Sequence, residues 1–141
     1  MTLTDVNVLV YAFRKDSPHH MQSAAWLGAM INSTQAFGMS DLVLSGFLRI
    51  VTNPKVFSAP STIERALSFE AILRDHPNCA TIAPGARHWG IFSNLCRSAG
   101  AKGNLVPDAY FAALAIESGS EWITTDRGFS RFAGLRWRLP W

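Results

Sequence analysis

One stretch decides the fold of this chain: Gly103-Asn104-Leu105-Val106-Pro107-Asp108-Ala109-Tyr110-Phe111-Ala112-Ala113-Leu114-Ala115-Ile116-Glu117. Alanines and larger apolar residues lie on almost every side of the helix that it predicts, so we expect nearly the whole helix to be buried. Pro107 suits the first helical position, because its missing N–H is not needed there. Asp108 then lies in the first turn, either as a cap or as a group used for chemistry.

Length and composition indicate one folded domain that spans residues 1–141. Hydrophobic residues make up 48% of the chain and charged residues 16%, which disfavours disorder. No apolar run reaches the roughly 18 residues of a membrane span, and no secretory signal is visible. Cys79 and Cys96 are expected to be buried free thiols, which favours a cytoplasmic location. The net charge of +3 is ordinary for a small protein, although it is compatible with a nucleic-acid partner.

Short apolar runs alternate with helical stretches along the chain. This alternation is typical of an α/β domain, in which a parallel sheet lies between helical layers. Right-handed crossovers then bring the strand ends to one face. Strands are expected within residues 1–13 and over 36–39, 79–83 and 121–124, and helices over 18–31, 42–52, 61–75, 86–99 and 103–117.

Local signals predict how several of these helices begin. Ser17 is expected to be an N-cap, with Pro18 at the first helical position. Ser61-Thr62-Ile63-Glu64 matches a capping box. In the helix after Pro84-Gly85, Trp89 is expected on the core side and His88 at the surface or rim.

Three aspartates fall at the places where an α/β domain builds its sites. Asp5 and Asp126 each follow a predicted strand, and Asp108 opens the buried helix, so the three can converge at the carboxyl edge of the sheet. Each also has a structural explanation. Asp5 can cap a helix, Asp108 can stabilise a helix N-terminus, and Asp126 can form an Asx-turn. Their joint placement is what favours a functional site.

Carboxylates gathered in one place repel one another and raise one another's pKa. A divalent cation relieves this repulsion. Mg²⁺ prefers oxygen ligands, keeps several waters and needs few protein carboxylates. Beside a phosphodiester it can activate a water molecule and neutralise charge on the phosphate, which is the chemistry of metal-dependent nucleases.

Three motifs resemble those of the PIN-domain ribonucleases, and they occur in the family's order and spacing. They are Thr4-Asp5-Val6-Asn7-Val8-Leu9-Val10-Tyr11-Ala12, Gly103-Asn104-Leu105-Val106-Pro107-Asp108-Ala109 with Ala112-Ala113-Leu114-Ala115 after it, and Thr124-Thr125-Asp126-Arg127-Gly128-Phe129-Ser130-Arg131-Phe132. Two more resemble the VapC-type toxins of bacterial type II toxin–antitoxin pairs. They are Gly46-Phe47-Leu48-Arg49-Ile50-Val51-Thr52-Asn53-Pro54 and Pro84-Gly85-Ala86-Arg87-His88-Trp89. The similarity runs from residue 2 to about residue 137.

The resemblance implies a three-layer α/β/α domain with a central parallel sheet. It implies cleavage of RNA with Mg²⁺ or Mn²⁺, neutralisation by a VapB-type antitoxin, and a homodimer. Asp5 and Asp108 match the family's metal-binding aspartates, and Asp126 matches an acid of its last motif. The resemblance also implies that the first strand ends near Asp5 and that residues 6–13 turn into a helix.

Two positions depart from the family pattern. The family usually has a glutamate where this chain has Gly46, and often a second acid where it has Gly128. Asp41 lies five residues before Gly46, about 140° round the helix, and is a poor substitute. Asn104 could add a neutral ligand or position a water. The loss of two carboxylates is expected to weaken metal affinity.

Three hypotheses remain open at this point. The leading one is a toxin-type endoribonuclease, in which Asp5, Asp108 and Asp126 hold Mg²⁺ as the catalytic residues. Arg49, Arg127 or Lys102 then holds RNA phosphates. The second is a phosphohydrolase with Asp5 as nucleophile. That chemistry needs a second aspartate two residues on, where this chain has Asn7. The third is a non-catalytic domain that binds RNA or a partner.

Overall fold

A five-stranded parallel sheet forms the centre of the molecule. The computed structural model describes residues 1–141, and the sheet has the strand order β3-β2-β1-β4-β5 with every neighbouring pair parallel. The strands are β1 (Thr2–Thr4), β2 (Phe37–Met39), β3 (Cys79–Thr81), β4 (Glu121–Ile123) and β5 (Trp137–Arg138). The predicted parallel sheet is therefore confirmed, although each strand is short.

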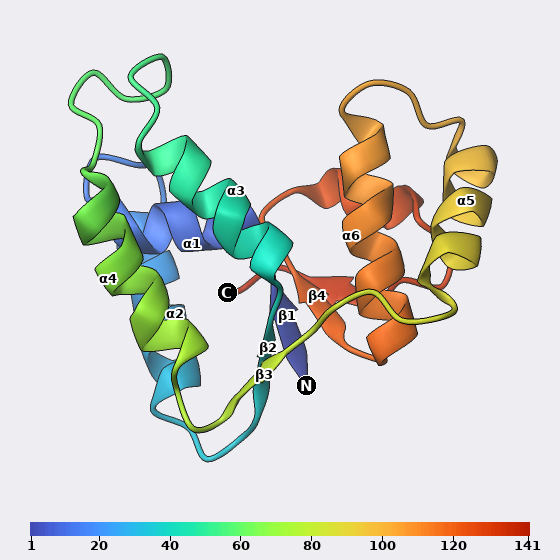
Figure 1. The fold of residues 1–141 in the computed structure, drawn as a ribbon, viewed down its shortest axis with the longest axis horizontal. Helices are drawn as coiled ribbons and strands as arrows, with labels where there is room; N and C mark the ends of the chain where they lie inside the picture. The colour runs from blue at the N-terminus through green and yellow to red at the C-terminus, as the bar shows by residue number, and fades with distance from the viewer.

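Six α-helices and one 3₁₀-helix cover this sheet. They are α1 (Val6–Phe13), α2 (His20–Ile31), α3 (Asp41–Val51), α4 (Ile63–Arg74), α5 (His88–Ala99), α6 (Leu105–Ser118) and η1 (Arg127–Arg131). Figure 1 shows α1 to α4 on one side of the sheet and α5 with α6 on the other. This arrangement confirms the three-layer α/β/α architecture. No helix is long and apolar enough to cross a membrane.

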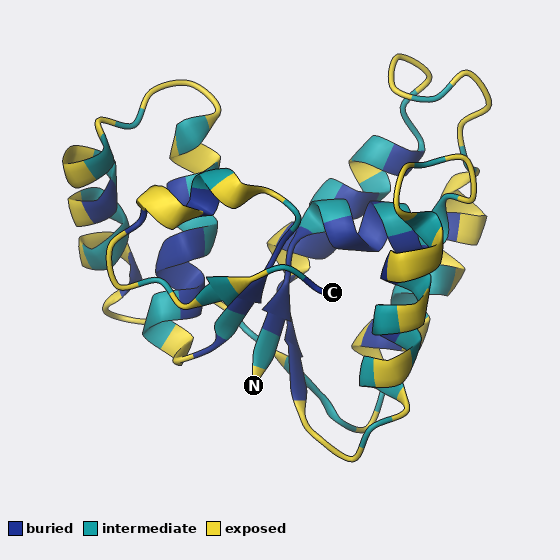
Figure 2. Ribbon diagram, turned by 180° about the vertical axis from the view of Figure 1, so that it is seen from behind, coloured by how far each residue is buried: buried dark blue, intermediate teal, exposed yellow.

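The core lies along the sheet and the inner faces of the helices, as the buried strands in Figure 2 show. The strands contribute Leu3, Phe37 and Trp122, each at most 1% exposed. The alanine-rich face of helix α6 is buried, with Ala112 and Ala113 fully covered, but the prediction that nearly the whole helix is buried was wrong, since Val106 and Pro107 are exposed. Small side chains let a helix backbone approach its neighbours closely, which is why this helix needs alanines.

The first apolar run divides as the resemblance implied. Strand β1 ends at Thr4, and Asp5 is the N-cap of α1, with its side chain accepting a hydrogen bond from the Val6 N–H. One residue therefore ends the strand, starts the helix and places a carboxylate at the edge of the sheet.

Several helix starts differ from the prediction, among them those of α6 and α2. Helix α6 begins at Leu105, so Pro107 is its third residue; the first four N–H groups of a helix have no intrahelical partner, and proline is tolerated there as well. Helix α2 begins at His20 after His19 in a left-handed conformation (φ 59°). The Ser17 hydroxyl instead donates to the Arg14 carbonyl at 2.5 Å.

The predictions for His88 and Trp89 were wrong. His88 is 2% exposed, with Nε2 3.0 Å from the Tyr110 carbonyl, whereas Trp89 is 69% exposed. The helix starts at His88 rather than at residue 86, and its buried face carries His88 and Leu95, which leaves Trp89 on the outer side.

Smaller corrections concern one cap and the thiols. The cap of α4 is Thr62, which accepts from the Arg65 N–H, and not Ser61. Cys79 and Cys96 are free, as predicted, but only partly buried.

Candidate active site

The sheet reverses its winding between β1 and β4. The chain leaves β1 towards β2 on one side, while β4 is reached from the other side, so the carboxyl ends of these two strands flank a crevice. Such switch points are where open parallel sheets bind ligands. Asp5 follows β1 here, and its backbone N–H donates to the Ile123 carbonyl of β4 at 2.9 Å.

Asp5 is held by three donors from two segments of the chain. One carboxylate oxygen accepts from the Val6 N–H (2.7 Å). The other accepts from the Thr124 hydroxyl (2.6 Å) and the Asn7 side-chain amide (3.0 Å). Thr124 and Asn7 also bond each other at 3.2 Å, so the carboxylate is fixed by a closed network.

The sequence reasoning did not assign a role to Thr124 or Asn7. Thr124 is fully buried, and its Oγ1 also accepts from the Asp126 N–H (3.0 Å). Asn7 Oδ1 accepts from the Thr125 N–H (3.3 Å). A signal was present, because Asn7 interrupts an apolar run two residues after Asp5.

The other two aspartates are held more loosely. Asp126 is exposed, and its Oδ1 accepts from the Gly128 N–H (2.7 Å), so the predicted Asx-turn is present. Asp108 is partly buried in the first turn of α6, where Asn104 is the N-cap and no side chain caps the helix. The structural explanations for Asp5 and Asp126 therefore hold alongside any functional role.

The charges of neighbouring acids nevertheless help to raise the pKa of Asp5 and of Asp108. Burial raises the pKa of Asp5 to about 7, and the charges of Asp108 and Asp126 add to this, against the opposing hydrogen bonds from Thr124 and Val6. Burial and the Asp126 charge also raise the pKa of Asp108, while Arg131 opposes them. The negative charge of these aspartates is therefore only partly balanced by nearby positive charge.

A groove of about 730 Å³ contains all three acids. Arg49 and Asn104 line it as well, as does Gly46, whereas Arg127 and Lys102 do not. Of the basic residues that the sequence suggested for binding phosphate, only Arg49 therefore faces the groove.

The loop after α3 forms one wall of the groove through Val56 and Phe57. Arg14 fixes this loop. Its guanidinium lies 4.1 Å from the centre of the Phe57 ring and donates to the Ala59 carbonyl (2.8 Å) and the Ser61 hydroxyl (2.9 Å). The wall is therefore anchored to the end of α1.

The donor set suits a hard cation, because the groove offers carboxylate oxygens and the side-chain amide of Asn104. No group of three or more His, Cys, Asp or Glu side chains lies close enough together to enclose a metal ion. The acids thus share a groove without forming a tight cage. Mg²⁺ does not require a cage, since it keeps several waters and binds through one or two carboxylates. The residues present fit such a water-rich site.

The two glycines differ in what surrounds them. A Cβ at Gly46 would lie 3.1 Å from Val6 Cγ2, a tight contact with the first residue of α1. A Cβ at Gly128 would lie 2.9 Å from Asp126 Oδ1. A side chain at position 46 would therefore need a small shift of Val6, and one at position 128 would need the Asp126 carboxylate to move.

The model of the PIN domain matches residues 2–135 of this chain. The chain is 41% identical over 140 residues to VapC ribonuclease Mb2897 of Mycobacterium bovis, covering 99% of this chain and 95% of that protein. It is 37% identical to Ribonuclease VapC25 of Mycobacterium tuberculosis, covering 99% of both. The chain belongs to the PIN-domain family. Its full-length similarity places this PIN domain among the VapC ribonucleases.

Solved structures agree on the fold. Mycobacterium tuberculosis VapC20, described as a sarcin–ricin loop cleaving toxin, has a TM-score of 0.67 at 14% identity, covering 96% of this PIN domain and 99% of that chain. VapBC2 from Rickettsia felis, bound to a DNA fragment from its promoter, gives 0.66 at 19% identity, covering 98% and 97%. At these identities the likeness concerns the fold alone.

Proposed function

We propose that this PIN domain is the toxin of a type II toxin–antitoxin pair and cleaves RNA with Mg²⁺ or Mn²⁺ bound at the groove. One observation carries the proposal: Asp5, Asp108 and Asp126 line one groove at the switch point of the sheet, and Asp5 has a pKa raised to about 7. A buried acid with a strongly raised pKa and like-charged neighbours, lying in a cleft, is characteristic of a functional site. The names of the VapC ribonucleases support the choice of RNA as substrate.

Each residue then has a distinct task. Asp5, Asp108 and Asp126 hold the metal. Thr124 and Asn7 orient the Asp5 carboxylate by donating hydrogen bonds to it. Arg49, which lines the same groove, binds a phosphate. The metal, when bound, supplies activation of water and neutralisation of charge on the scissile phosphate.

The decisive experiment is an RNA cleavage assay with analysis of the product ends. Attack by water predicts a 5′-phosphate and a 3′-hydroxyl, and activity that EDTA removes and Mg²⁺ or Mn²⁺ restores. A 2′,3′-cyclic phosphate, or full activity in EDTA, would contradict the proposal. Calorimetric titration that finds no Mn²⁺ binding at millimolar concentration, together with no cleavage, would favour the non-catalytic alternative.

The proposed partner is a VapB-type antitoxin. Related folds have been solved as the complexes VapBC2 and VapBC-1, which supports a partner of this kind. Expression of the chain alone is expected to arrest growth, and co-expression of the small protein encoded next to it is expected to restore growth. The homodimer and the cytoplasmic location stay predictions; size-exclusion chromatography with light scattering tests the former.

A further inference from the structure

A second hollow of about 760 Å³ lies at the opposite end of the sheet. Its walls come from the beginnings of strands, including Thr2 of β1 and Glu121 of β4, and from the end of α2 through Trp26 and Met30. The acids lie at the carboxyl ends of the same strands. The two sites are therefore separate, and the proposed cleavage chemistry makes no use of this hollow.

Basic side chains outnumber acidic ones in the hollow. Arg136 and Arg138 line it together with the single acid Glu121. Arg138 pairs with Glu121 at 3.1 Å, but both side chains are more than a third exposed, so the pair can exchange partners at little cost. Arg136 donates one N–H to the Gly119 carbonyl and keeps its other donors.

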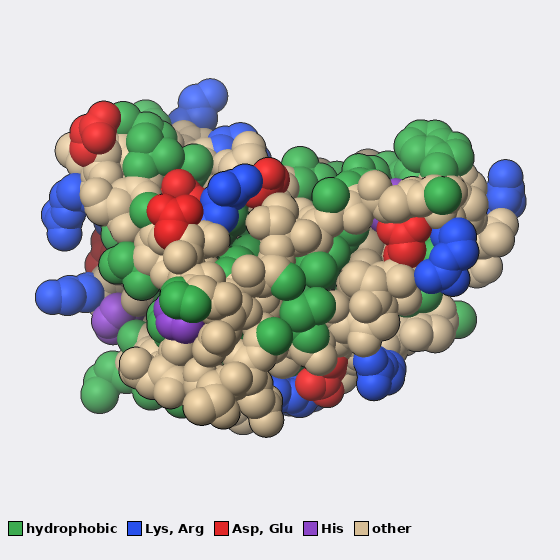
Figure 3. All heavy atoms as spheres, turned by 60° about the horizontal axis from the view of Figure 1, so that its bottom comes forward, with side chains coloured by type: hydrophobic (Ala, Val, Ile, Leu, Met, Phe, Trp, Pro, Cys, Tyr) green, Lys and Arg blue, Asp and Glu red, His purple; other side chains and the backbone are tan.

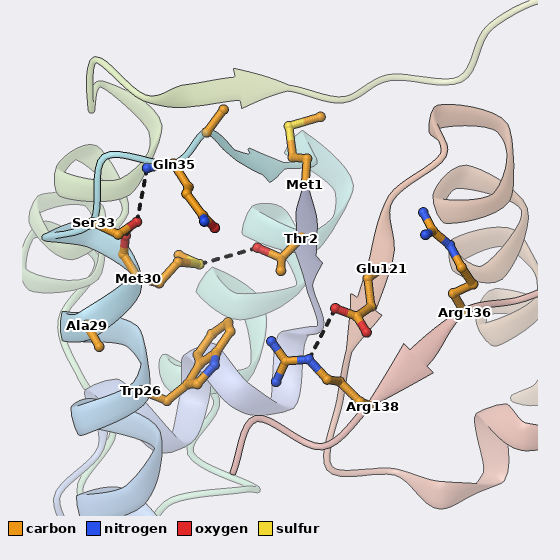
Figure 4. Close-up of a pocket in the computed structure, with 11 residues that line it drawn as sticks. Met1, Thr2, Trp26, Ala29, Met30, Ser33, Gln35, Glu121, Arg136 and Arg138 are labelled. Carbon is orange, nitrogen blue, oxygen red and sulfur yellow. Dashed lines mark hydrogen bonds and ion pairs between the residues drawn. The ribbon is translucent and has the colours of Figure 1, made fainter.

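The floor of the hollow combines an aromatic surface with polar groups. In Figure 4 the Trp26 indole, the Met30 thioether and the Gln35 amide point towards the space beside Thr2. Gln35 is anchored through its backbone N–H, which donates to the Ser33 hydroxyl (3.3 Å). Its side-chain amide is therefore available to both donor and acceptor groups of a ligand.

These groups match the parts of a nucleotide. An indole stacks on any base, an amide reads a base edge, and guanidinium groups bind phosphate. The volume also lies within the usual range for a small ligand, about 300–1,000 Å³. Basic side chains are scattered over the face shown in Figure 3, whereas the hollow combines two arginines with the half-buried Trp26.

The C-terminal tail connects the hollow to aromatic side chains beside the acidic groove. The C-terminal tail continues from Arg138 to Trp141, whose ring lies 5.6 Å from that of His19. His19 in turn lies 6.0 Å from Tyr11, which lines the groove. Unpaired bases stack on such surfaces one after another.

We propose that the hollow binds a nucleotide of the single-stranded RNA whose scissile phosphate lies in the acidic groove, with its base on Trp26 and its phosphate at Arg136 and Arg138. This proposal rests on the proposed function for its substrate class and extends it to a second contact. It assigns to the basic, aromatic tail the task of holding the strand outside the cleavage site.

The test measures binding without cleavage. Fluorescence anisotropy in EDTA measures the affinity of a 2′-O-methyl RNA dodecamer. Trp26→Ala is expected to weaken dodecamer binding about tenfold. Arg136→Gln and Arg138→Gln are each expected to lower the salt slope of dodecamer binding by about one. Arg65→Gln, an exposed arginine on α4, is the matched control and should change neither.

Several outcomes would overturn the proposal. If Trp26→Ala, Arg136→Gln and Arg138→Gln all leave dodecamer binding unchanged, the proposal is overturned. The two arginine variants change exposed side chains, so they test it even if Trp26→Ala fails to fold. Adenosine monophosphate that binds the hollow as tightly as the dodecamer would assign it to a free nucleotide instead. A change in oligomeric mass in the arginine variants would assign it to a second copy of the chain. Because the assay contains no metal, wild type that binds RNA in this way but never cleaves it would sink the proposed function alone.

Discussion

The charged side chains at the two ends of the sheet differ in burial and in how firmly they are held. At the carboxyl end, Asp5 is almost completely buried, and three donors fix its carboxylate. At the amino end, Arg136 and Arg138 are exposed and bound only loosely. Burial makes the charged form of a side chain energetically costly, and the three donors fix the position of the Asp5 carboxylate. Neither effect applies to the two exposed arginines. The comparison teaches that one short sheet can offer a preorganised end for chemistry and an adaptable end for binding.

Removing Asp5 or Asp108 from the groove should have the largest effect. Asp5→Asn and Asp108→Asn are each expected to lower kcat/KM for RNA on the order of a thousandfold, because the charge that stabilises the transition state through the metal is lost. Asp75→Asn, at the exposed end of α4, is the matched control. Cleavage assays with purified protein check this, and either variant retaining a tenth of wild-type activity would contradict the assignment of its aspartate.

The same buried acid should make stability fall as the pH rises. The pKa of Asp5 is about 7 in the folded protein against 3.8 in the unfolded chain, so the folded state binds more protons between these values. Without metal, the free energy of unfolding therefore falls through this range, by about 4 kcal/mol at most. Urea unfolding in EDTA should show this fall in wild type and not in Asp5→Asn. Parallel pH curves for the two proteins would exclude the raised pKa.

Removing a hydrogen bond that orients the Asp5 carboxylate should have the next largest effect on activity. Thr124→Val removes a 2.6 Å hydrogen bond to the carboxylate and should lower activity about 10–100-fold. Because that bond favours the charged form, its loss raises the pKa of Asp5 further, and the pH at half-maximal activity should move upward. Thr125→Val is the control, since Thr125 contributes only its backbone N–H to Asn7. A drop in activity with no movement of the pH profile would indicate a merely structural role.

Introducing an acid at position 46, with space for its side chain, should strengthen metal binding in the groove. Gly46→Glu alone meets Val6 at 3.1 Å, so we expect little gain in Mn²⁺ affinity. Combined with Val6→Ala, which removes the two methyl groups in the way, it is expected to tighten Mn²⁺ binding about tenfold, since affinity rises with ligand charge. Calorimetry checks both variants. Equal affinities for the two would show that Val6 is not what closes the position.

The smallest effect is expected at the amino end. Glu121→Gln removes the charge from an exposed pair, and the free energy of unfolding should change by less than about 1 kcal/mol. Thermal unfolding at low and high salt measures it. A loss of several kcal/mol would mean that the two ends are not as different as their burial suggests.

Much of the fold could be predicted from sequence, because the signals are local and repeated. The alanines of α6 and the alternation of helices with apolar runs each indicate a buried layer. Helix boundaries were less accurate. The burial of His88 and Trp89 was assigned the wrong way round because neighbouring residues lie about 100° apart on a helix, and the buried face of α5 carries His88 and Leu95.

The site was predictable in part. Strand ends and helix starts indicated Asp5, Asp108 and Asp126, and all three line the groove. Their roles still rest on the proposal. Thr124 was missed because its hydrogen bond to Asp5 joins residues 119 positions apart, and no spacing in the sequence encodes such a contact.

The anchoring of the loop by Arg14 has a consequence for how this enzyme can diversify. The guanidinium holds the loop through the Ala59 carbonyl and the face of Phe57, and leaves the side chains of Lys55, Val56 and Ser58 exposed. Of these three, Val56 lines the groove, so a substitution there changes the groove wall while the Arg14 contacts stay in place. The side chain on this wall of the groove can therefore change while Arg14 keeps the loop backbone in place. A change in RNA preference can arise there without moving Asp5, Asp108 or Asp126.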